Sequence, residues 1–436
     1  MAANTIQLPD DIPDGNPHYI QAVTELGDEQ EVKAQDDIYA SNGMKLVAKG
    51  TRVNRDLYER LTRHKLKAPL DFQLGAEHQI DAAELAIEAA RLLEEDPLLE
   101  RLVNRTGELL SVKHGFVQMK LREPLNFRLT VMRARREELF RHSLRCGLIS
   151  HALAIYLKFA PADQEAILLA AMCHDLGEMH TDPALLAPER KILPDEQRYV
   201  RVHPITGYVL LRDLTAPPVD CMNAVLQHHE RLDGSGYPYG LSASRISRLG
   251  KLLAVVEVTE TMLRRHDPHR LDILLKLNHA RFDSQVISAL RDLMQHDFKE
   301  TDTPLAEDSY LNTLDQIGKM LKVWKDFSEY FEKDSAEHED AQEALAFLFT
   351  RMREFRSVML QAGIDADDVE SLLDMVREDT ELLNEMQATL DELVWRMNEI
   401  ANETDAKAPR LNDSTQIALH NFIDALRPQQ SRSEQL

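Results

Sequence analysis

The sequence predicts a mainly α-helical protein with a small N-terminal β-containing module and a C-terminal helical bundle or hairpin. Glycine and aromatic residues are scarce, with 16 glycines and 6% aromatic residues in 436, while Leu, Ala, Glu and Arg, which favour helices, are abundant. Apolar residues recur at helical spacing along most of the chain. The exception is Asn42-Gly43, a strong hairpin turn signal between two short β-prone segments.

The N-terminal residues 1–75 are expected to form a leader and a small α/β module. Residues 1–35 are rich in Asp, Pro, Gly and Gln, which predicts a loosely ordered leader. Residues 38–48 predict two strands around the Asn-Gly turn, and Asn54 then resembles a cap before apolar residues at helical spacing. We expect this module to have a regulatory or structural role.

The middle of the chain is expected to be helical throughout. Residues 76–125 predict a helical connector without chemistry of its own. The apolar spacing within 126–160 predicts one long amphipathic helix, and helices continue to about residue 300. Residues 126–300 are therefore expected to form the principal domain.

Residues 301–436 are expected to form an acidic helical region. Apolar stripes there keep three- and four-residue spacing, which predicts a helical hairpin or bundle. The stripes could form a homodimer seam, bind a protein partner or fill the inside of the bundle, and the intramolecular alternative is slightly favoured. About 30 acidic and about 13 basic side chains lie in this region, so it carries most of the net charge of −23.

Charge and composition exclude some functions and compartments. A net charge of −23 argues against nucleic acid as a partner, because binding a phosphate backbone requires clustered cations. No apolar run approaches the roughly 18 residues of a membrane span, and the N-terminus lacks a signal-peptide pattern. Cys146, Cys173 and Cys221 are set among apolar residues and are expected to be buried free thiols. A cytoplasmic protein is expected.

Histidines and carboxylates that suit a transition metal gather in the principal domain. His174-Asp175, His203 and His228-His229 fall within about 60 residues. Neighbouring residues on a helix project about 100° apart, so each adjacent pair can reach two metals or bracket one. The number of donors exceeds what a single ion needs, and the pattern predicts a metal site.

A loop after the histidine pair indicates close approach to a ligand. Gly234, Ser235 and Gly236 permit backbone conformations that bulkier residues avoid. Tyr237 adds a stacking face with a hydroxyl, and Pro238 fixes the exit of the loop.

Glu138 and His142 stand one turn apart on the expected long helix. An i, i+4 pair shares a helix face, so the two side chains could bind one metal together, although on an arbitrary helix a surface pair is the better interpretation. His151 falls on the opposite face from His142 and is excluded. His180, taken alone, is interpreted as a packed or solvated histidine.

These motifs together resemble the HD-GYP family, metal-dependent phosphohydrolases of the HD superfamily, many of which hydrolyse cyclic di-GMP. The resemblance spans roughly residues 126 to 298 and rests on His174-Asp175-Leu176-Gly177-Glu178, on His203-Pro204-Ile205-Thr206-Gly207 and on the segment from His228 to Pro238. It implies an all-helical core that binds two or three divalent transition-metal ions. The carboxylate-rich histidine set favours Fe or Mn.

The resemblance also implies roles for individual residues. His142 matches the family's upstream histidine, Glu138 matches a glutamate of three-metal members, and Glu257 stands where the family has an aspartate. The implied metal ligands are Glu138, His142, His174, Asp175, His203, His228, His229 and Glu257. The implied catalytic residues are His174, Asp175 and Glu178.

Substrate contacts are expected from the loop and from arginines. The loop contributes Gly236, Tyr237 and Pro238, and Arg270 belongs to a segment that replaces the family's Arg-Pro-Tyr-Arg. Arg198 and Arg201 precede His203 and are candidate phosphate contacts, with a solvated helix face as an equal alternative.

One departure from the family bears directly on function. Glu178 stands where the family has a lysine that contacts substrate phosphate. Two charges about 4 Å apart interact by about 4 kcal/mol at an effective dielectric of 20, so reversing one weakens phosphate binding unless the carboxylate is protonated, metal-bound or turned away.

Three functions remain open from the sequence. The chain is a cyclic di-GMP phosphodiesterase of bacterial second-messenger signalling, a metal phosphohydrolase for another phosphoester, or a nonhydrolytic scaffold that binds partners through its helical tail. The enzyme is favoured because each inferred ligand position carries His, Asp or Glu, and buried carboxylates without a cation are costly.

Overall fold

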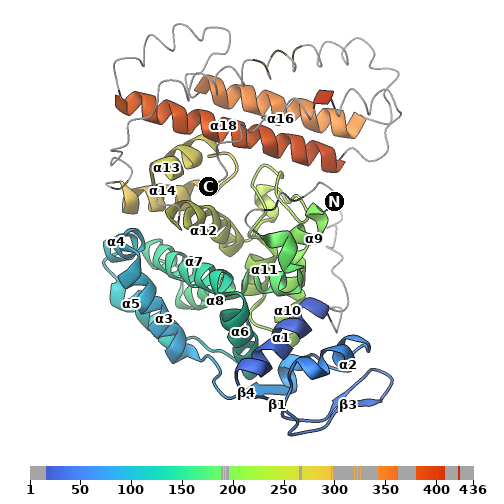
Figure 1. The fold of residues 1–436 in the computed structure, drawn as a ribbon. Coiled ribbons are helices and arrows are strands. Elements are labelled where there is room, and N and C mark those ends of the chain that lie inside the picture. The colour runs from blue at the N-terminus through green and yellow to red at the C-terminus, as the bar shows by residue number, and fades with distance from the viewer. Residues whose placement is uncertain are drawn as a thin grey trace. The chain divides into compact units, whose positions relative to one another are not determined.

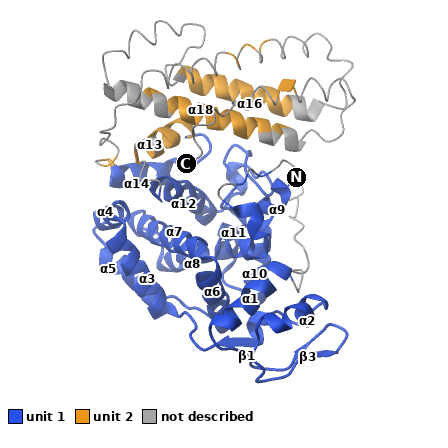
Figure 2. Cartoon of the chain, in the orientation of Figure 1, with its two compact units in different colours: residues 1–266, 279–294 blue, residues 267–278, 295–436 orange. Residues whose placement is uncertain are grey.

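The computed structural model describes residues 16–187, 190, 192, 196–264, 268–295, 297, 319, 322, 325, 342–361, 380–407 and 421–422. Helices dominate these residues and strands are few and short, which confirms the mainly α fold class (Figure 1). The chain divides into two compact units, one of residues 1–266 and 279–294 and one of residues 267–278 and 295–436 (Figure 2). None of the described helices has the length and apolar content needed to cross a membrane.

The first unit begins with a helix that the sequence analysis missed. Helix α1, Pro17–Glu29, starts at Asn16, whose side chain accepts hydrogen bonds from two backbone amides of the first turn. Proline at the first helical position and a buried apolar stripe that includes Ile20 and Val23 stabilise it. The expectation of a loosely ordered leader was therefore wrong for residues 16–29, while residues 1–15 lie outside the described part of the chain.

Two small antiparallel sheets follow α1. Strand β1, Val32–Ala34, pairs with β4, Leu74–Ala76, and β2, Ile38–Tyr39, pairs with β3, Lys45–Val47. The predicted Asn-Gly hairpin is confirmed, because Gly43 has a φ of +85° and the Asn42 side chain accepts a hydrogen bond from the Met44 amide.

Short helices connect these sheets to the principal domain. The 3₁₀ turn η1, Arg55–Leu57, and α2, Tyr58–Thr62, follow Asn54, whose side chain makes no capping bond. After the 3₁₀ turn η2, Leu70–Phe72, and strand β4 come α3, Ala82–Glu95, α4, Pro97–Arg105, and α5, Leu109–Val117. These confirm the helices expected in the connector region.

The predicted long helix of 126–160 is two helices. Helix α6, Glu123–Arg135, ends at Arg136, whose φ of −141° and ψ of 61° are not helical, and α7, Glu137–Tyr156, begins after it. The apolar periodicity continues across this break, so the sequence pattern alone did not reveal it.

The core of the first unit is a group of packed helices. Helix α7 packs on α8, Pro161–Cys173, and both contact α12, Arg248–Arg264. Helix α11, Val219–Gln227, lies against α8, α12 and α10, His203–Leu214, while α9, Gln197–Arg201, leads into α10. Helix α14, Ser284–Met294, contacts α4, α7 and α12. The helices α7, α8, α10, α11 and α12 supply the residues of the candidate site.

The second unit is helical, as expected. Helices α16, Gln342–Gln361, and α18, Thr380–Lys407, pack on each other, and α13, Pro268–Leu277, packs on α18. Members of the predicted apolar stripes, among them Leu348, Phe355, Leu390 and Leu393, are buried. Whether the stripes also form a homodimer seam or bind a protein partner stays a prediction. The domain boundaries given above remain predictions.

Candidate metal centre

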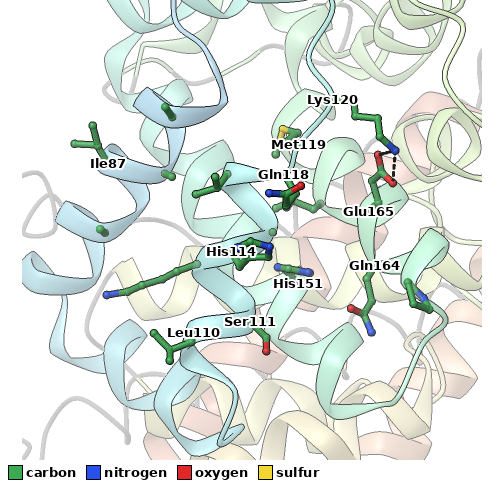
Figure 3. Close-up of a pocket in the computed structure, with 18 residues that line it drawn as sticks. Ile87, Leu110, Ser111, His114, Gln118, Met119, Lys120, His151, Gln164 and Glu165 are labelled. Atoms are coloured by element: carbon green, nitrogen blue, oxygen red, sulfur yellow. Dashed lines mark hydrogen bonds and ion pairs between the residues drawn. The ribbon is translucent and has the colours of Figure 1, made fainter.

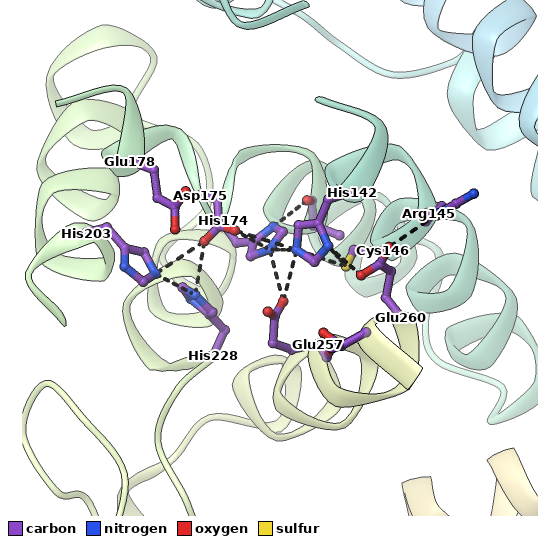
Figure 4. A network of polar contacts seen from close by, with 12 residues as sticks. His142, Arg145, Cys146, His174, Asp175, Glu178, His203, His228, Glu257 and Glu260 are labelled. Atoms are coloured by element: carbon purple, nitrogen blue, oxygen red, sulfur yellow. Dashed lines mark hydrogen bonds and ion pairs between the residues drawn. The ribbon is translucent and has the colours of Figure 1, made fainter. Parts of the chain in front are cut away.

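Five helices, or the turns directly after them, bring most of the predicted ligands together. His142 lies on α7, His174 ends α8 and is followed by Asp175, and His203 begins α10. His228 ends α11 and is followed by His229, while Glu257 comes from α12 (Figure 4). Most of these side chains are fully or nearly buried.

The ligand atoms form two groups. The first donor group contains His142, Cys146, His174 and Glu257, and the second contains Asp175, His203, His228 and His229. Within each group all ligand atoms lie within 4.8 Å of one another. The structure thus brings together every predicted metal ligand except Glu138, and it adds Cys146.

The carboxylate of Asp175 lies between the two groups. Its Oδ2 is 3.3 Å from His174 Nε2 and 3.5 Å from His142 Nε2. Its Oδ1 is 3.2 Å from His203 Nε2 and 3.4 Å from His228 Nε2. One carboxylate oxygen therefore faces each group, which is the arrangement of a carboxylate shared by two metal ions.

The histidines are oriented with Nε2 toward the centre. In His174, His203 and His228, Nδ1 lies 2.7 Å from the backbone carbonyl oxygen three residues earlier. A carbonyl only accepts, so each of these Nδ1 atoms donates and the neutral ring presents the Nε2 lone pair inward.

The donor atoms are arranged as a cation would require. His142 Nε2 and His174 Nε2 are 3.0 Å apart, and His203 Nε2 and His228 Nε2 are 3.1 Å apart. Facing lone pairs repel unless a cation lies between them. Asp175 Oδ1 and Glu257 Oε2 are also buried without a hydrogen-bond partner. The residues therefore fit divalent transition-metal ions, for which imidazole and carboxylate are suitable ligands.

Burial and the charge of Asp175 shift the pKa values of the second group in different directions. Burial lowers the pKa of His228 to about 4 and the pKa of His229 well below its usual value. Burial also disfavours the charged form of His203, but Asp175 outweighs it and raises the pKa of that ring. Burial alone would raise the pKa of Asp175, but the adjacent imidazoles, His174 above all, bring it well below the usual range. Neutral imidazoles around an ionised carboxylate are the ligand form of these residues.

Glu138 is not part of this arrangement. It is exposed on the first turn of α7 and belongs to neither donor group. The carboxylate beside the His142 ring comes instead from Glu260 of α12, whose Oε2 lies 2.7 Å from His142 Nδ1. Glu260 lies one helical turn after Glu257, and this three-residue spacing could have identified Glu260 from the sequence as a second carboxylate on the same face.

Glu178 lies beside the centre but outside both donor groups. It follows Asp175 on the 3₁₀ turn η3, Leu176–His180, and its carboxylate is 3.6 Å from the Arg136 guanidinium. Burial, with the negative charge of Asp175, raises the pKa of Glu178 to about 7.

The loop after His229 is closely packed against the site. A Cβ at Gly236 would lie 2.4 Å from backbone atoms of residues 229, 230 and 231, so only glycine fits. The Tyr237 amide donates to the His229 carbonyl, and the Tyr237 ring stacks on the His229 ring at 4.5 Å between centroids. Pro238 is half-buried directly after it.

Buried side chains that the sequence analysis missed hold this loop. The carboxylate of Glu230 accepts hydrogen bonds from the Tyr239 and Leu241 amides and is 1% exposed. In the turn before α14, the buried Arg281 donates to Ser235 Oγ at 3.1 Å.

The predicted arginines differ in position. The Arg201 guanidinium lies 5.4 Å from the centroid of the Tyr237 ring, so it is next to the loop. Arg198 is exposed and donates to the hydroxyl of Tyr199, its neighbour in the chain. Arg270 lies in α13 of the second unit, and its side chain is outside what the structure describes.

His151 is a packed histidine, as expected. It lies in neither donor group, its Nδ1 is 3.2 Å from the Val112 carbonyl oxygen, and burial lowers its pKa. It borders a cavity of about 1100 Å³ lined by residues of α3, α5 and α8 (Figure 3). A Cβ at Gly115 would lie 2.0 Å from the His151 ring, so this glycine accommodates the ring.

The N-terminal residues contact the turn that carries Glu178. Tyr19 stacks on His180 at 5.6 Å between centroids, and the Asn16 amide donates to the His180 carbonyl. The Arg128 guanidinium contacts His180 Nε2 and forms a buried ion pair with Asp71 at 2.7 Å. His180 is therefore packed, as expected, and ties η3 to α1.

Comparisons with known proteins agree with this geometry. The HD domain family matches residues 129–286. A cyclic di-GMP phosphodiesterase of Pseudomonas aeruginosa is 33% identical over 29% of this chain and 30% of its own length. A 3'3'-cGAMP-specific phosphodiesterase of Vibrio cholerae is 28% identical over 37% of this chain and 39% of its own length. A cyclic di-GMP phosphodiesterase of Thermotoga maritima is 28% identical over 38% of this chain and 44% of its own length.

The chain thus spans less than half the length of these curated relatives. No solved structure is significantly similar to this chain.

Proposed function

Since this chain carries an HD domain of the HD-GYP family, we propose that it is a metal-dependent phosphodiesterase that hydrolyses cyclic di-GMP in bacterial second-messenger signalling. The observation that carries the proposal is the position of Asp175, whose two carboxylate oxygens face two separate groups of inward-pointing histidines. A packed core would not need this arrangement, because facing Nε2 lone pairs and unpaired buried carboxylate oxygens are costly without cations.

Two divalent ions are the number that this geometry supports. His142, His174 and Glu257 would hold one, His203, His228 and His229 the other, and Asp175 would bridge them. A third ion would need Glu138, which is exposed on the first turn of α7. Bound there, the ions would polarise the phosphodiester and lower the pKa of the attacking water.

The chain's own residues supply binding and orientation. The Tyr237 ring, fixed against His229, offers a face on which a base can stack, and Arg201 adds a cation near that ring. Gly236 keeps the backbone of the loop close to residues 229–231.

Glu178 is compatible with an anionic substrate. Burial and the charge of Asp175 raise its pKa to about 7 in the metal-free protein, and Arg136, 3.6 Å from the carboxylate, offsets the charge of the ionised form. The repulsion that a fully ionised glutamate would impose on a phosphate is thereby reduced.

A second candidate substrate is 3'3'-cGAMP, because two relatives that are 28% and 27% identical to this chain are named for that specificity. The nonhydrolytic scaffold is the remaining alternative, and it predicts no turnover of any phosphoester by the metal-loaded protein.

The test is hydrolysis by the full chain. Metal-loaded protein would be incubated with cyclic di-GMP, with 3'3'-cGAMP and with a chromogenic phosphodiester, beside Asp175→Asn and the exposed control Asp220→Asn. We expect cleavage of cyclic di-GMP by the wild type and the control, and loss of both activity and bound metal in Asp175→Asn. Cleavage of 3'3'-cGAMP but not of cyclic di-GMP would identify 3'3'-cGAMP as the substrate. Metal binding without hydrolysis of any of the three compounds would favour the nonhydrolytic scaffold.

A further inference from the structure

We propose that the cavity bordered by α3, α5 and α8 is a binding site for a small amphipathic anion. Such a ligand has an apolar body, a hydroxyl or N–H group that donates a hydrogen bond, and a negative charge. None of the described residues that line the cavity belongs to either metal donor group. The site is therefore separate from the metal centre, and the proposal does not depend on the proposed reaction.

The walls of the cavity are largely apolar. On α3, Ile87 is 59% exposed, and Ala83 and Ala90 share its helix face and leave space beside it. On α5, Leu110 and Val117 are 81% and 50% exposed. Large apolar side chains that gather exposed around one hollow indicate a binding site. With a volume of about 1100 Å³, the cavity can hold an organic molecule with fused rings or a long chain.

His151 places a buried hydrogen-bond acceptor among these apolar residues. It is 5% exposed, and its Nδ1 lies 3.2 Å from the Val112 carbonyl oxygen. A carbonyl only accepts, so Nδ1 carries the proton and Nε2 of the neutral ring has a lone pair. No residue that the structure describes donates to Nε2, although the ring lines the cavity (Figure 3). A buried acceptor without a donor is costly, so a ligand with a hydroxyl or N–H group is favoured.

Lys113 supplies a positive charge in the same part of the molecule. It directly follows the residue whose carbonyl accepts from His151, and it lines the cavity together with the exposed His114. Within the described part of the chain, Lys113 has no carboxylate partner. Lys120 and Glu165, which also line the cavity, form an ion pair with each other at 2.9 Å. In a chain with a net charge of −23, a lysine without such a partner beside an apolar hollow favours an anion.

These features together indicate one class of ligand. Apolar walls alone would suit many occupants, including the apolar face of another protein chain. The buried acceptor on α7 and the lysine on α5 add two polar contacts of different kinds. A molecule that donates to His151 and carries a negative charge for Lys113 satisfies both. A small amphipathic anion is therefore favoured over a protein partner, whose binding would instead produce an oligomer.

Naphthalene probes can test the anion and the donor separately. The compound 6-anilinonaphthalene-2-sulfonate has the apolar body, the N–H donor and the anion. N-phenyl-2-naphthylamine lacks the sulfonate, and naphthalene-2-sulfonate lacks the N–H group. Binding of the first two to the full chain would be measured by fluorescence titration, and binding of the third by competition with the first. We expect saturable binding of the complete probe at one site, and about five- to tenfold weaker binding of each incomplete probe.

Variants of the chain assign the two contacts. Lys113→Glu should weaken binding of the two sulfonates about tenfold and leave binding of N-phenyl-2-naphthylamine unchanged. Lys251→Glu is the matched control, because Lys251 is also half-buried but does not line the cavity. His151→Phe should weaken binding of the two N–H probes about fivefold and leave naphthalene-2-sulfonate unchanged. Thermal unfolding would establish that each variant is folded, and if His151→Phe is not, the comparison of Lys113→Glu with its control decides.

Two results would overturn the proposal. One is the absence of saturable binding of 6-anilinonaphthalene-2-sulfonate to the folded wild type, or equal binding of this probe by the wild type and Lys113→Glu. The other is a wild-type dimer, measured by light scattering, that Ile87→Glu converts to a monomer. The control for this measurement is Val219→Glu, at a 62% exposed position outside the cavity. A dimer that only Ile87→Glu dissociates would show that the apolar walls bind a second copy of the chain.

Discussion

Glu260 Oε2 lies 2.7 Å from His142 Nδ1, although the two residues are 118 positions apart. Glu260 is 1% exposed, and Arg145 and Arg264 lie 3.8 and 3.7 Å from its Oε1. A carboxylate in this position fixes the ring with Nε2 toward the centre and increases its basicity as a ligand.

The first prediction compares Glu260 with Glu138. Glu260→Ala should weaken binding at the first metal position by about 10- to 100-fold, the usual effect of losing such a partner of a ligand histidine. Glu138→Ala should leave it unchanged because Glu138 is exposed and outside the donor groups. Competition with a chromogenic chelator measures both. Equal losses in the two variants would restore the sequence-based assignment of Glu138.

The second prediction concerns the pH dependence of stability. Glu178 has a pKa of about 7 in the folded protein against 4.5 ordinarily, so its ionisation destabilises the fold. For a raised carboxyl pKa, stability falls as pH rises from about 4.5 through about 7, and the loss for this shift is about 3 kcal/mol.

Metal-free Glu178→Gln should lack this loss. Near pH 4.5 the thermal unfolding midpoint of this variant should be equal to or lower than that of the wild type. At pH 8 it should be higher than that of the wild type. Parallel midpoints for the two proteins across the window would show that Glu178 keeps an ordinary pKa.

The third prediction tests Glu178 against the substrate. If cyclic di-GMP is the substrate and Glu178 stands where the family has its lysine, Glu178→Lys should lower KM roughly tenfold. Steady-state kinetics at saturating metal measures the change. Loss of metal uptake in Glu178→Lys would instead place this carboxylate among the groups that the metal centre needs.

The fourth prediction distinguishes two arginines. Arg201→Ala should raise KM about tenfold, since its guanidinium lies beside Tyr237. Arg198→Ala should have little effect because Arg198 is exposed and bonded to Tyr199. KM and kcat would be measured for both variants, and a larger KM effect from Arg198 would contradict this description of the site.

The fifth prediction concerns the buried ion pair between Arg128 and Asp71, whose side chains are 2% and 1% exposed. Asp71→Ala leaves the arginine charge buried without its partner, which should cost about 3 to 5 kcal/mol. Denaturant unfolding measures the loss. Glu59→Ala removes an exposed ion pair with Arg63 and should change stability little. A similar small change from Asp71→Ala would mean that water or another group compensates Arg128.

The sequence by itself determined the helical class, the hairpin and most residues of the candidate metal centre. Asn42-Gly43 fixes its turn locally, because glycine readily adopts the positive φ required there. His174-Asp175 and His228-His229 were recognisable because adjacent ligand-type residues are informative without a structure. Signals of this kind depend only on adjacent residues, so they can be recognised without knowing how distant helices pack.

Only the tertiary structure decided which side chains meet. Helix packing places Glu260 of α12 beside His142 of α7, brings Cys146 into a donor group and leaves Glu138 exposed. Contacts between residues more than 100 positions apart depend on how helices cross, and no local spacing encodes that. The break at Arg136 is likewise not specified by apolar periodicity, which continues across it.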